Sequence, residues 1–580
     1  MGCNSSIQYE DRKSEKAIKA AVLIQNWYRG YKSRLELRRR QAMNIFESIE
    51  YADEQDQLQL ANFFSFMLEN YTTNNKDSSE SLSQLFVNTT KRKLEPETFI
   101  RNINVPDTYY GPRLKFPLTF SDVILLIDAF KENQILHARY VLQLLQEVKK
   151  VLQQLPNIVP VTSTLSKDLT ICGDIHGKLD DLFLIFYKNG LPSGNNRYIF
   201  NGDFVDRGQN SMEVLMVLFS FLLVYPSDVY LNRGNHEDYL MNMRYGFTKE
   251  IMQKYKEHGG KILRFLEEVY TWLPIGTIID EKILVIHGGI AENTDLNILK
   301  QIKRNKMKSV LMPPITHSGV NLKYGHHDLP LSSISAIDQL SKIEWEQIIT
   351  VFSASNYYEE GSNRGAYIKL GQDNVPRFFQ YQSNHITQGK TLHERVDIVE
   401  SAAFKILGER MISRQSSLIK AFHKYDPNNT GKISVRDWAK ATEEVLELSL
   451  PWLSLCPRVV KMIENGYVLY EMGFKDMPVV KAPQEAKSAT IETLVRYRSD
   501  LKIIFNIIDR DQSGLISMDE FRAMWKLFSS HYNIDIEDAH VDQLANSMDL
   551  NKDGSIDFNE FLTAFDVVHR LDRNSVKSQN

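Results

Sequence analysis

The sequence predicts an α/β domain with a sheet layered by helices, preceded by a basic helix and followed by an all-helical region. From about residue 118 to 285, short apolar strands alternate with apolar helices. After about residue 400 the pattern is helical, and its acidic loops contain glycine. Residues 12–40 hold ten Lys or Arg against two acids, with apolar residues at helical spacing.

Length and composition indicate an ordinary soluble chain of several domains. The chain is long enough for about four domains of roughly 150 residues, and its net charge of −4 gives no reason to expect nucleic acid as a partner. The three cysteines, Cys3, Cys172 and Cys456, cannot build a disulfide framework, so a reducing, cytoplasmic location is expected. The longest apolar run, 214–225, is too short to cross a bilayer and predicts a buried helix. The N-terminus is polar and then basic, with no secretory signal.

Four short apolar stretches are the expected strands. They lie at residues 169–171, 198–200, 229–231 and 283–286, with helices expected at 180–187 and 211–224. Each strand is followed at once by a stretch in which glycine stands beside Asp, His or Asn. These stretches are GDIHG (173–177), GDFVDRG (202–208), RGNHE (233–237) and HGG (287–289).

The strand-end stretches predict a metal-dependent site. In a sheet layered with helices, sites gather beyond the carboxyl ends of the strands, and glycine allows the backbone to turn sharply and approach closely there. Aspartate, histidine and asparagine suit Mn, Fe or Zn, and this mixture does not select one of them. Any single stretch could be a turn that ends a strand. Four of them at successive strand ends indicate a dinuclear phosphoesterase.

Together the four stretches resemble the motifs of the serine/threonine phosphoprotein phosphatases. The resemblance covers roughly residues 118–385 and includes FSASNY at 352–357. It implies a metallophosphoesterase fold, a sandwich of sheets layered with helices, acting on phosphoserine or phosphothreonine in proteins. It also implies two metal sites, the first held by Asp174, His176 and Asp203, the second by Asp203, Asn235 and His287.

The same resemblance implies the catalytic groups. His236 would be the general acid, oriented by Asp206, and Arg207 would grip the phosphate with Tyr357 nearby. The candidate catalytic residues are His236, Asp206, Arg207, Arg233 and Tyr357. Two ions about 3.5–4 Å apart clamp the attacking and leaving oxygens of an in-line displacement and activate a water. The family implies Mn support, with Mg²⁺ a further candidate.

One part of the family pattern is missing. The family carries Trp-Ser-Asp-Pro before a phosphate-binding arginine, and an Arg-x-His whose histidine completes the second metal site. Here Trp345 is followed by Glu, and no histidine between 288 and 352 stands in Arg-x-His. Those histidines are His317, His326 and His327. An expected helix at 343–350 runs into an expected strand at 350–353 with no Gly, Pro, Asn or Asp between them. Such a change normally needs one of these residues, so a segment is expected to be skipped near 349–350, as by alternative splicing.

Two acidic loops, 509–520 and 549–560, fit the twelve-residue EF-hand calcium loop. Positions 1, 3 and 5 supply side-chain oxygens, position 7 a carbonyl, and glutamate at 12 both oxygens. The expected ligands are Asp509, Asp511, Ser513, Leu515 and Glu520, then Asp549, Asn551, Asp553, Ser555 and Glu560. A third loop, 426–437, ends in Asp437 instead of glutamate, so calcium binding and a calcium-free loop both stay open there. Residues 465–466 would belong to its degraded partner.

Residues 24–34 match the IQ motif, IQxxxRGxxxR. A helix here would carry apolar anchors on a basic surface, which suits the acidic grooves of calmodulin-like proteins. A basic helix packed on its own protein is the alternative. The expected calmodulin contacts are Ile24, Gln25, Arg29, Gly30 and Arg34.

Gly2 followed by Cys3 fits an N-myristoylation pattern beside a palmitoylation site, which would give peripheral membrane contact. A chance match is the alternative, because the pattern is so short.

The order of these parts resembles the protein phosphatases with EF-hand domains. The expected segments are 1–15 (a candidate acylated N-terminus), 16–45 (IQ helix), 118–385 (catalytic domain), 405–475 (degenerate EF-hand region) and 490–570 (paired EF hands). The resemblance implies a calcium-regulated phosphatase. The missing segment leaves a second interpretation open, a catalytically impaired form that binds calcium and calmodulin.

Overall fold

The structure is a computed structural model that describes residues 3–74, 100, 103–163, 168–289, 295–310, 348–383 and 391–470, the last range with gaps at 413, 461 and 464–465. It also describes the short stretches 515–517, 519 and 554–557. The chain forms two compact units. Unit 1 comprises Met1–Ala52, Asn356–Asn363 and Asn384–Glu492, and unit 2 comprises Asp53–Ser355, Arg364–Ser383 and Thr493–Asn580.

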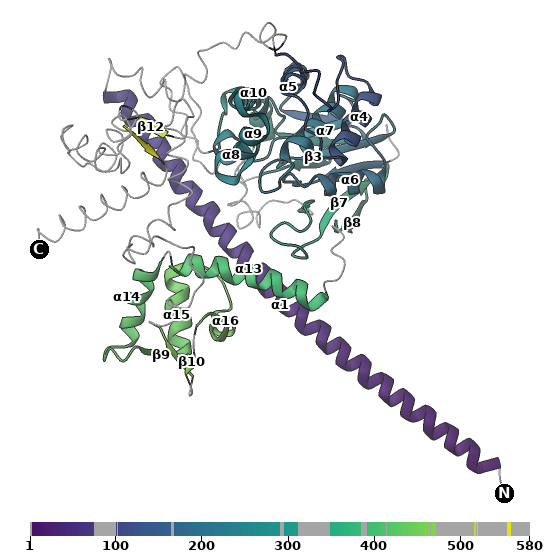
Figure 1. Ribbon diagram of the computed structural model, residues 1–580, viewed down its shortest axis with the longest axis vertical. Coiled ribbons are helices and arrows are strands. Elements are labelled where there is room, and N and C mark those ends of the chain that lie inside the picture. Colours follow the sequence, from purple (N-terminus) through teal and green to yellow (C-terminus); the bar gives the residue numbers. More distant parts are fainter. Residues whose placement is uncertain are drawn as a thin grey trace, which may run out of the picture. The chain divides into compact units, whose positions relative to one another are not determined.

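The described residues between 158 and 381 of unit 2 form two sheets, with helices over one of them (Figure 1). The larger sheet has the order β4-β3-β2-β7-β8 and the smaller has the order β1-β5-β6. Strands β2, β3 and β4 are parallel, whereas β7 is antiparallel to β2. The strands are β1 Ile158–Val161, β2 Asp168–Cys172, β3 Asn196–Asn201, β4 Val229–Asn232, β5 Gly276–Ile279, β6 Ile283–Ile286, β7 Gly365–Leu370 and β8 Pro376–Tyr381.

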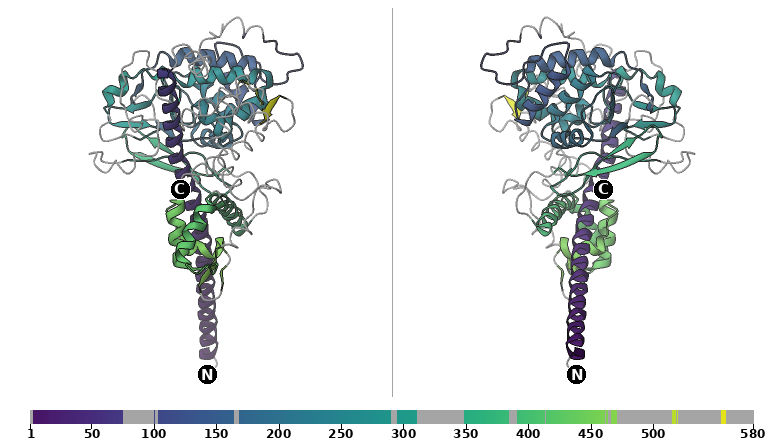
Figure 2. Two further views of the ribbon diagram at one scale, coloured as in Figure 1. Left: turned by 90° about the vertical axis from the view of Figure 1, so that its left-hand side faces the viewer. Right: turned by 90° about the vertical axis from the view of Figure 1, so that its right-hand side faces the viewer.

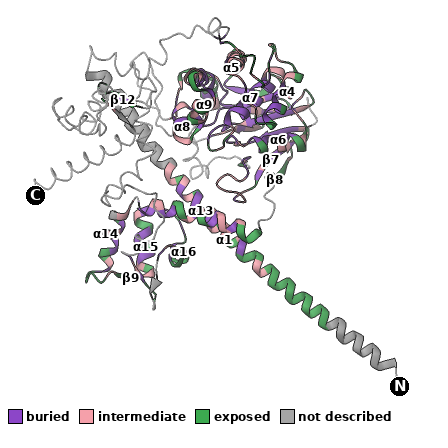
Figure 3. Ribbon diagram, viewed as in Figure 1, coloured by how far each residue is buried: buried purple, intermediate pink, exposed green. Residues whose placement is uncertain are grey.

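Both faces of the larger sheet are buried. Leu169 and Ile171 of β2 pack against Val285 of the smaller sheet, whereas Cys172, on the opposite face, belongs to the core beneath the helices. This follows from the two-residue period of a strand. The helices are α4 Phe120–Lys131, α5 Ala138–Leu152, α6 Leu179–Asn189, α7 Ser211–Val224, α8 Tyr239–Tyr245, α9 Phe247–Tyr255 and α10 Gly259–Tyr270. Figure 3 shows α7 almost wholly buried, as its continuous apolar run predicts.

The four predicted strands at 169–171, 198–200, 229–231 and 283–286 and the two predicted helices at 180–187 and 211–224 are confirmed, with boundaries that shift by at most two residues. The predicted helix at 343–350 is wrong for Ile348, Ile349 and Thr350, which are not helical, and its remainder lies outside the described residues. The predicted strand at 350–353 reduces to one bridge between Phe352 and Asp174. Strand β7 already occupies that edge of β2, so the segment forms its bridge beyond the end of β2, where the Phe352 carbonyl also accepts from the Ala366 N–H at 2.8 Å.

Unit 1 is helical. It contains the first part of α1 Cys3–Asn74, together with α13 Leu392–Ile412, α14 Gln415–Tyr425, α15 Val435–Leu446 and α16 Trp452–Val459. A small sheet joins β9 Lys432–Ser434, β10 Met462–Ile463 and β11 Tyr467–Leu469 in the order β10-β11-β9. Helix α1 extends beyond the predicted 16–45, because no glycine or proline interrupts residues 31–74.

Two further predictions concern the helices and the C-terminal loops. Among the described helices, none combines the length and the apolar character that a membrane crossing needs. Strands β12 Leu515–Ser517 and β13 Ser555–Asp557 pair with Ile516 opposite Ile556, which places the two predicted calcium loops side by side. Of the predicted calcium ligands, Leu515 and Ser555 are described and the other eight lie outside the described residues.

Candidate active site

The first group of candidate ligands lies where β2 and β3 end. The Nε2 atom of His176 is 3.9 Å from Oδ2 of Asp174 and 3.7 Å from Oδ2 of Asp203. Its Nδ1 atom lies 2.9 Å from the carbonyl oxygen of Val205, so the N–H belongs on Nδ1 and Nε2 is left for a metal. Burial, with the neighbouring His236, lowers the pKa of His176 to about 3, which keeps the ring neutral.

The second group adds donors from β4 and from the smaller sheet. His287 Nε2 lies 3.3 Å from Oδ2 of Asp203 and 2.9 Å from Oδ1 of Asn235. Its Nδ1 lies 2.7 Å from the carbonyl oxygen of Asn201, which directs Nε2 to the same point as the two oxygens. Side-chain donor atoms of Asp174, Asp203 and His287 all lie within 4.8 Å of one another, as do those of His176, Asp203 and His236. The donors predicted from the sequence are therefore brought together.

Charge within this cluster favours a cation. Burial raises the pKa of Asp174 to about 7, and the negative charge of Asp203 contributes to this rise. Burial opposes charge on His287, but the carboxylates of Asp203 and Asp174 outweigh it and raise the pKa of His287 to about 10. The metal-free site thus holds a proton on His287, and a divalent ion would displace it.

The amide of Asn235 can be oriented in two ways. Turned over, its nitrogen would donate to His287 Nε2 at 2.9 Å. As drawn, its oxygen faces Nε2 at the same distance. We favour the oxygen facing inward, because a protonated His287 donates to it and a metal would be bound by it.

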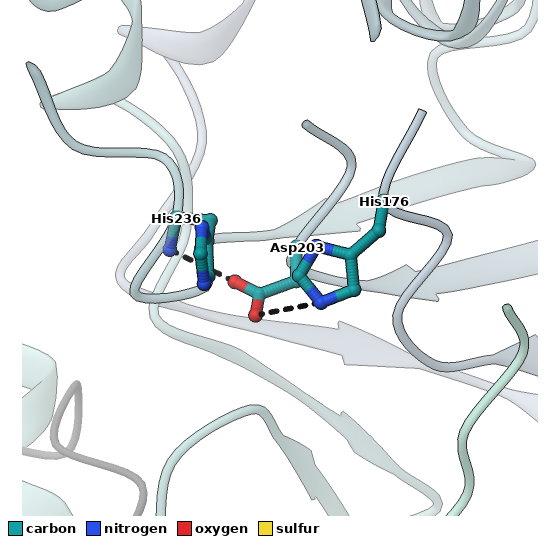
Figure 4. Close-up of side chains that lie close together, drawn as sticks. All are labelled: His176, Asp203 and His236. Carbon is teal, nitrogen blue, oxygen red and sulfur yellow. Dashed lines mark hydrogen bonds and ion pairs between the residues drawn. The ribbon is translucent and has the colours of Figure 1, made fainter. Parts of the chain in front are cut away.

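A second network holds the candidate general acid. The ring nitrogen Nδ1 of His236 lies 2.8 Å from Oδ2 of Asp206. The backbone N–H of His236 donates to Oδ1 of Asp203 at 2.9 Å. Asp206 also accepts from the Asn242 amide at 2.9 Å and from the Phe247 N–H at 3.0 Å. Figure 4 shows His176 and His236 on either side of the Asp203 carboxylate. Burial would lower the pKa of His236, but Asp203 and Asp206 together raise it.

Glu237 holds the two metal-ligand loops together. Its carboxylate accepts from the N–H groups of Asp203, Phe204 and Gly234, each at 2.8 Å. Gly234 packs so closely that an added Cβ would lie 2.2 Å from Oδ1 of Asp203, so only glycine fits at this position. Glu237 belongs to the RGNHE stretch, from which no role was predicted for it, and no role was predicted for Asn242. Asn242 lies 36 residues beyond Asp206 without a motif of its own, so only the fold reveals their contact.

The two candidate arginines differ in position. Arg207 is exposed, and its guanidinium lies over the Tyr245 ring at 4.1 Å from the centroid. Arg233 is buried, and its guanidinium donates to the carbonyl oxygens of Glu237, Met307 and Lys308. The Arg207 guanidinium is therefore accessible from solvent, whereas the contacts of Arg233 hold neighbouring backbone in place.

Four residues of the site have left-handed backbone. The φ angles are +46° at His176, +52° at Asp203, +70° at Asp206 and +65° at Arg207. Such conformations are costly for residues other than glycine and gather at functional sites.

The candidate residue Tyr357 lies in the segment 356–363, which belongs to unit 1, where its hydroxyl donates to Oε1 of Glu50 at 2.9 Å.

Comparison with known proteins first defines the class. A family model for calcineurin-like phosphoesterases matches residues 168–383. Other models match as an EF-hand domain pair at 498–565, an IQ calmodulin-binding motif at 18–38 and a PPP5 TPR repeat region at 85–160. The chain is thus a calcineurin-like phosphoesterase with an EF-hand pair and an IQ motif.

Full-length relatives then define the family. Serine/threonine-protein phosphatase with EF-hands 1 of Rattus norvegicus is 54% identical over 99% of this chain and 99% of its own. The human serine/threonine-protein phosphatase with EF-hands 2 is 39% identical over 98% of this chain and 96% of its own. The serine/threonine-protein phosphatase rdgC of Drosophila melanogaster is 38% identical over 96% of this chain and 91% of its own. This chain belongs to the family of serine/threonine protein phosphatases with EF-hands.

The alignment with the rat protein is longer than the chain. It extends over 635 positions, whereas the chain has 580 residues, so at least 55 positions have no residue here (635 less 580). This agrees with the prediction that a segment is missing from this chain.

Proposed function

We propose that this chain hydrolyses phosphoserine and phosphothreonine esters in proteins with the help of two divalent ions. The observation that carries the proposal is the convergence of four donor side chains, those of Asp174, His176, Asn235 and His287, on Asp203. Asp174, His176 and Asp203 would hold one ion, and Asp203, Asn235 and His287 the other. When bound, these ions supply the activation of a water and the charge that stabilises the phosphoryl oxygens. The donor set suits Mn²⁺ without excluding Fe, Zn or Mg²⁺.

The protein groups would carry the remaining steps. Arg207 would bind the phosphate at the edge of the site, and the water oxygen would form a bond to phosphorus as the bond from phosphorus to the serine oxygen breaks. His236 would give the proton on Nε2 to that serine oxygen, because its Nδ1 faces the Asp206 carboxylate at 2.8 Å. No phosphoenzyme forms, and buried Cys172, whose pKa burial raises far above its usual range, has no part as a nucleophile.

The second candidate function is that of a catalytically impaired form that binds calcium and calmodulin. It is favoured by the second ion site, which has three protein ligands among the described residues and lacks the fourth that the family pattern supplies. The phosphate-binding arginine that the family carries after HGG is missing too.

Metal content and activity distinguish the two functions. We expect one firmly bound transition metal per purified chain by elemental analysis, lost in Asp203→Asn and kept in His287→Ala, which removes a candidate ligand of the second ion and none of the first. A metal content unchanged by Asp203→Asn would contradict this assignment. A phosphopeptide assay with Mn²⁺ would compare this chain with a version whose missing segment is restored from a relative. Activity only in the restored version would establish the impaired form.

We also propose that a calmodulin-like protein binds residues 24–34. These residues lie on α1, where Ile24, Trp27 and Tyr28 are exposed at 64%, 65% and 56%. An exposed apolar stripe within a basic surface supports this partner. Ile24→Asp with Gln25→Ala should abolish capture on immobilised calmodulin, and equal retention would exclude the motif.

We propose further that the chain is cytoplasmic and touches membranes through acyl chains on Gly2 and Cys3. Support comes from the sequence pattern alone, since Gly2 and the Cys3 side chain lie outside the described residues. Labelling with a clickable myristate analogue should fail in Gly2→Ala. Absence of label in the parent chain would contradict the proposal.

A further inference from the structure

Residues 415–470 of unit 1 are built like an EF-hand pair. Helices α14 and α15 flank the loop 426–437, and β9 of this loop pairs with β11, Ile433 opposite Val468. Gly431, at the sixth loop position, has φ +73°, which the sharp bend of a calcium loop requires. The framework is that of a calcium loop, but the bonds within it are different.

The carboxylate at the first loop position is saturated by protein donors. Asp426 accepts from the Thr430 N–H at 2.9 Å, the Thr430 hydroxyl at 3.0 Å and the Gly431 N–H at 2.7 Å. Its Oδ2 also accepts from the Tyr470 hydroxyl at 3.1 Å. The Thr430 N–H and these other donors hold the pKa of Asp426 below its usual range, so the group is ionised. Both of its oxygens are thus engaged by protein donors.

The carboxylate at the last loop position is also engaged. Oδ2 of Asp437 accepts from the Ser434 hydroxyl at 2.6 Å, and the Ser434 oxygen accepts from the Asp437 N–H at 3.1 Å. This reciprocal bonding begins α15, with Ser434 as the N-cap residue. An ordinary calcium loop has glutamate here and chelates through both oxygens. Asp437 is one methylene shorter and serves the helix instead.

The same region holds a helix in its core. Helix α1 buries four apolar residues among α13, α14, α15 and α16, and both views of Figure 2 show it running beside these green helices. The four are Ala42, Ile45, Phe46 and Ile49. Their spacing of i, i+3, i+4 and i+7 is the pattern by which an apolar groove holds an amphipathic helix. At the rim, Arg38 donates to Glu400 at 3.1 Å and to Asp397 at 2.7 Å.

We propose that residues 392–470 are a calcium-independent receptor for the 35–49 segment of α1, its loop closed by Tyr470 and Ser434 in place of calcium. The receptor anchors one part of the helix that carries the IQ motif, and it does so in resting and calcium-loaded cells alike. Calcium control of this chain would then rest with the loops at 509–520 and 549–560. The inference holds whether or not the chain is an active phosphatase.

Hydrogen exchange of the full chain, followed by mass spectrometry with calcium and with a chelator, tests the receptor. We expect slow exchange at 40–50 and 435–456 in both conditions. Phe46→Ala should speed exchange in both segments by about a hundredfold, since such truncations cost several kcal/mol. Leu37 lies on an exposed face of the same helix, with an exposed fraction of 58%, so Leu37→Ala should change the exchange rate in neither segment. Protection that appears only with calcium would overturn the proposal, as would equal effects of the two substitutions.

Calcium binding to the chain carrying Glu520→Gln and Glu560→Gln tests whether the loop 426–437 is free of calcium. Titration calorimetry of this variant should detect no calcium ion bound by 426–437. A remaining ion that Asp426→Asn removes would overturn the proposal. In Tyr470→Phe, which removes one hydroxyl, exchange at 426–434 should be faster by about tenfold with and without calcium. Unchanged exchange would overturn the assignment of Tyr470.

Discussion

Oδ2 of Asp206 lies 2.8 Å from Nδ1 of His236, and the same oxygen accepts from the Asn242 amide. The aspartate is fully buried and its other oxygen is bonded to the Phe247 N–H. Asp206 therefore fixes the orientation of the imidazole. Against the effect of burial, Asp203 and Asp206 raise the pKa of His236, and in the protonated ring the proton on Nε2 points away from Asp206. This relationship makes His236 the group on which proton transfer to the leaving oxygen would depend.

His236→Asn should lower kcat for a phosphopeptide by about 10²–10⁴-fold, because loss of a general acid has that effect. The comparison is made on a chain with measurable activity, with or without the missing segment restored. His393→Asn serves as the control, since His393 lies on α13 with a side chain about half exposed, at 48%. A His236→Asn protein as active as the parent would remove the assignment.

Glu237→Gln should weaken metal binding by about 10–100-fold, because outer-sphere partners of ligands have effects of this size. The amide has only one oxygen, so the N–H groups of Asp203, Phe204 and Gly234 cannot all be satisfied. Competition with a fluorescent chelator measures the affinity. Glu250→Gln is the matched control, since that carboxylate accepts two N–H groups at the start of α7, from Ser211 and Met212. Equal losses in the two variants would show a general loss of folding instead.

Unit 1 should lose stability in acid through Glu400. Burial raises the pKa of this carboxyl, but hydrogen bonds from Arg458 and Arg38 outweigh it and lower the pKa below the ordinary 4.5. A lowered folded-state pKa stabilises the fold above pH 4.5, and the contribution is lost as pH falls through the folded value. Glu400→Gln should cost about 1.5–3 kcal/mol at neutral pH.

The stability of unit 1 is measured by thermal unfolding of the full chain, with hydrogen exchange in α13 as the local probe. The difference between parent and Glu400→Gln should shrink as the pH falls below 4.5. A difference that stays constant with pH would mean that the substitution acts through packing alone.

The C-terminal EF-hand pair should bind two calcium ions with dissociation constants of about 10⁻⁷–10⁻⁵ M, as sensor loops do. Glu520→Gln with Glu560→Gln removes one chelating oxygen from each loop and should abolish binding in this range. Calorimetry on the full chain gives the stoichiometry. Asp437→Asn, in the loop closed by protein hydrogen bonds, should leave it unchanged, and a stoichiometry that falls in this variant would contradict the assignment.

The strands and the ligand set of the site were predictable because their chemistry is local. Each apolar strand ends in its own glycine-containing loop, so Asp174, Asp203, Asn235 and His287 could be identified from short stretches. Parallel pairing of β2, β3 and β4 brings three of those loops to one edge of the sheet. The roles of Asn242 and Glu237 were not predictable, because each depends on contacts with a loop more than 30 residues away.

The sequence by itself determined which polar residues follow the strands, the two full EF-hand loop patterns, the IQ motif and the lack of an Arg-x-His between 288 and 352. These depend on residue type and spacing within a few residues. Only the tertiary structure decided that α1 packs its residues 42–49 into the degenerate EF-hand region and that Tyr470 bonds to Asp426. Only the fold also decided that Arg233 bonds to backbone carbonyls instead of facing a ligand. The physical reason is that burial and hydrogen-bond partners are properties of segments that meet in space, and no local spacing specifies which segments will meet.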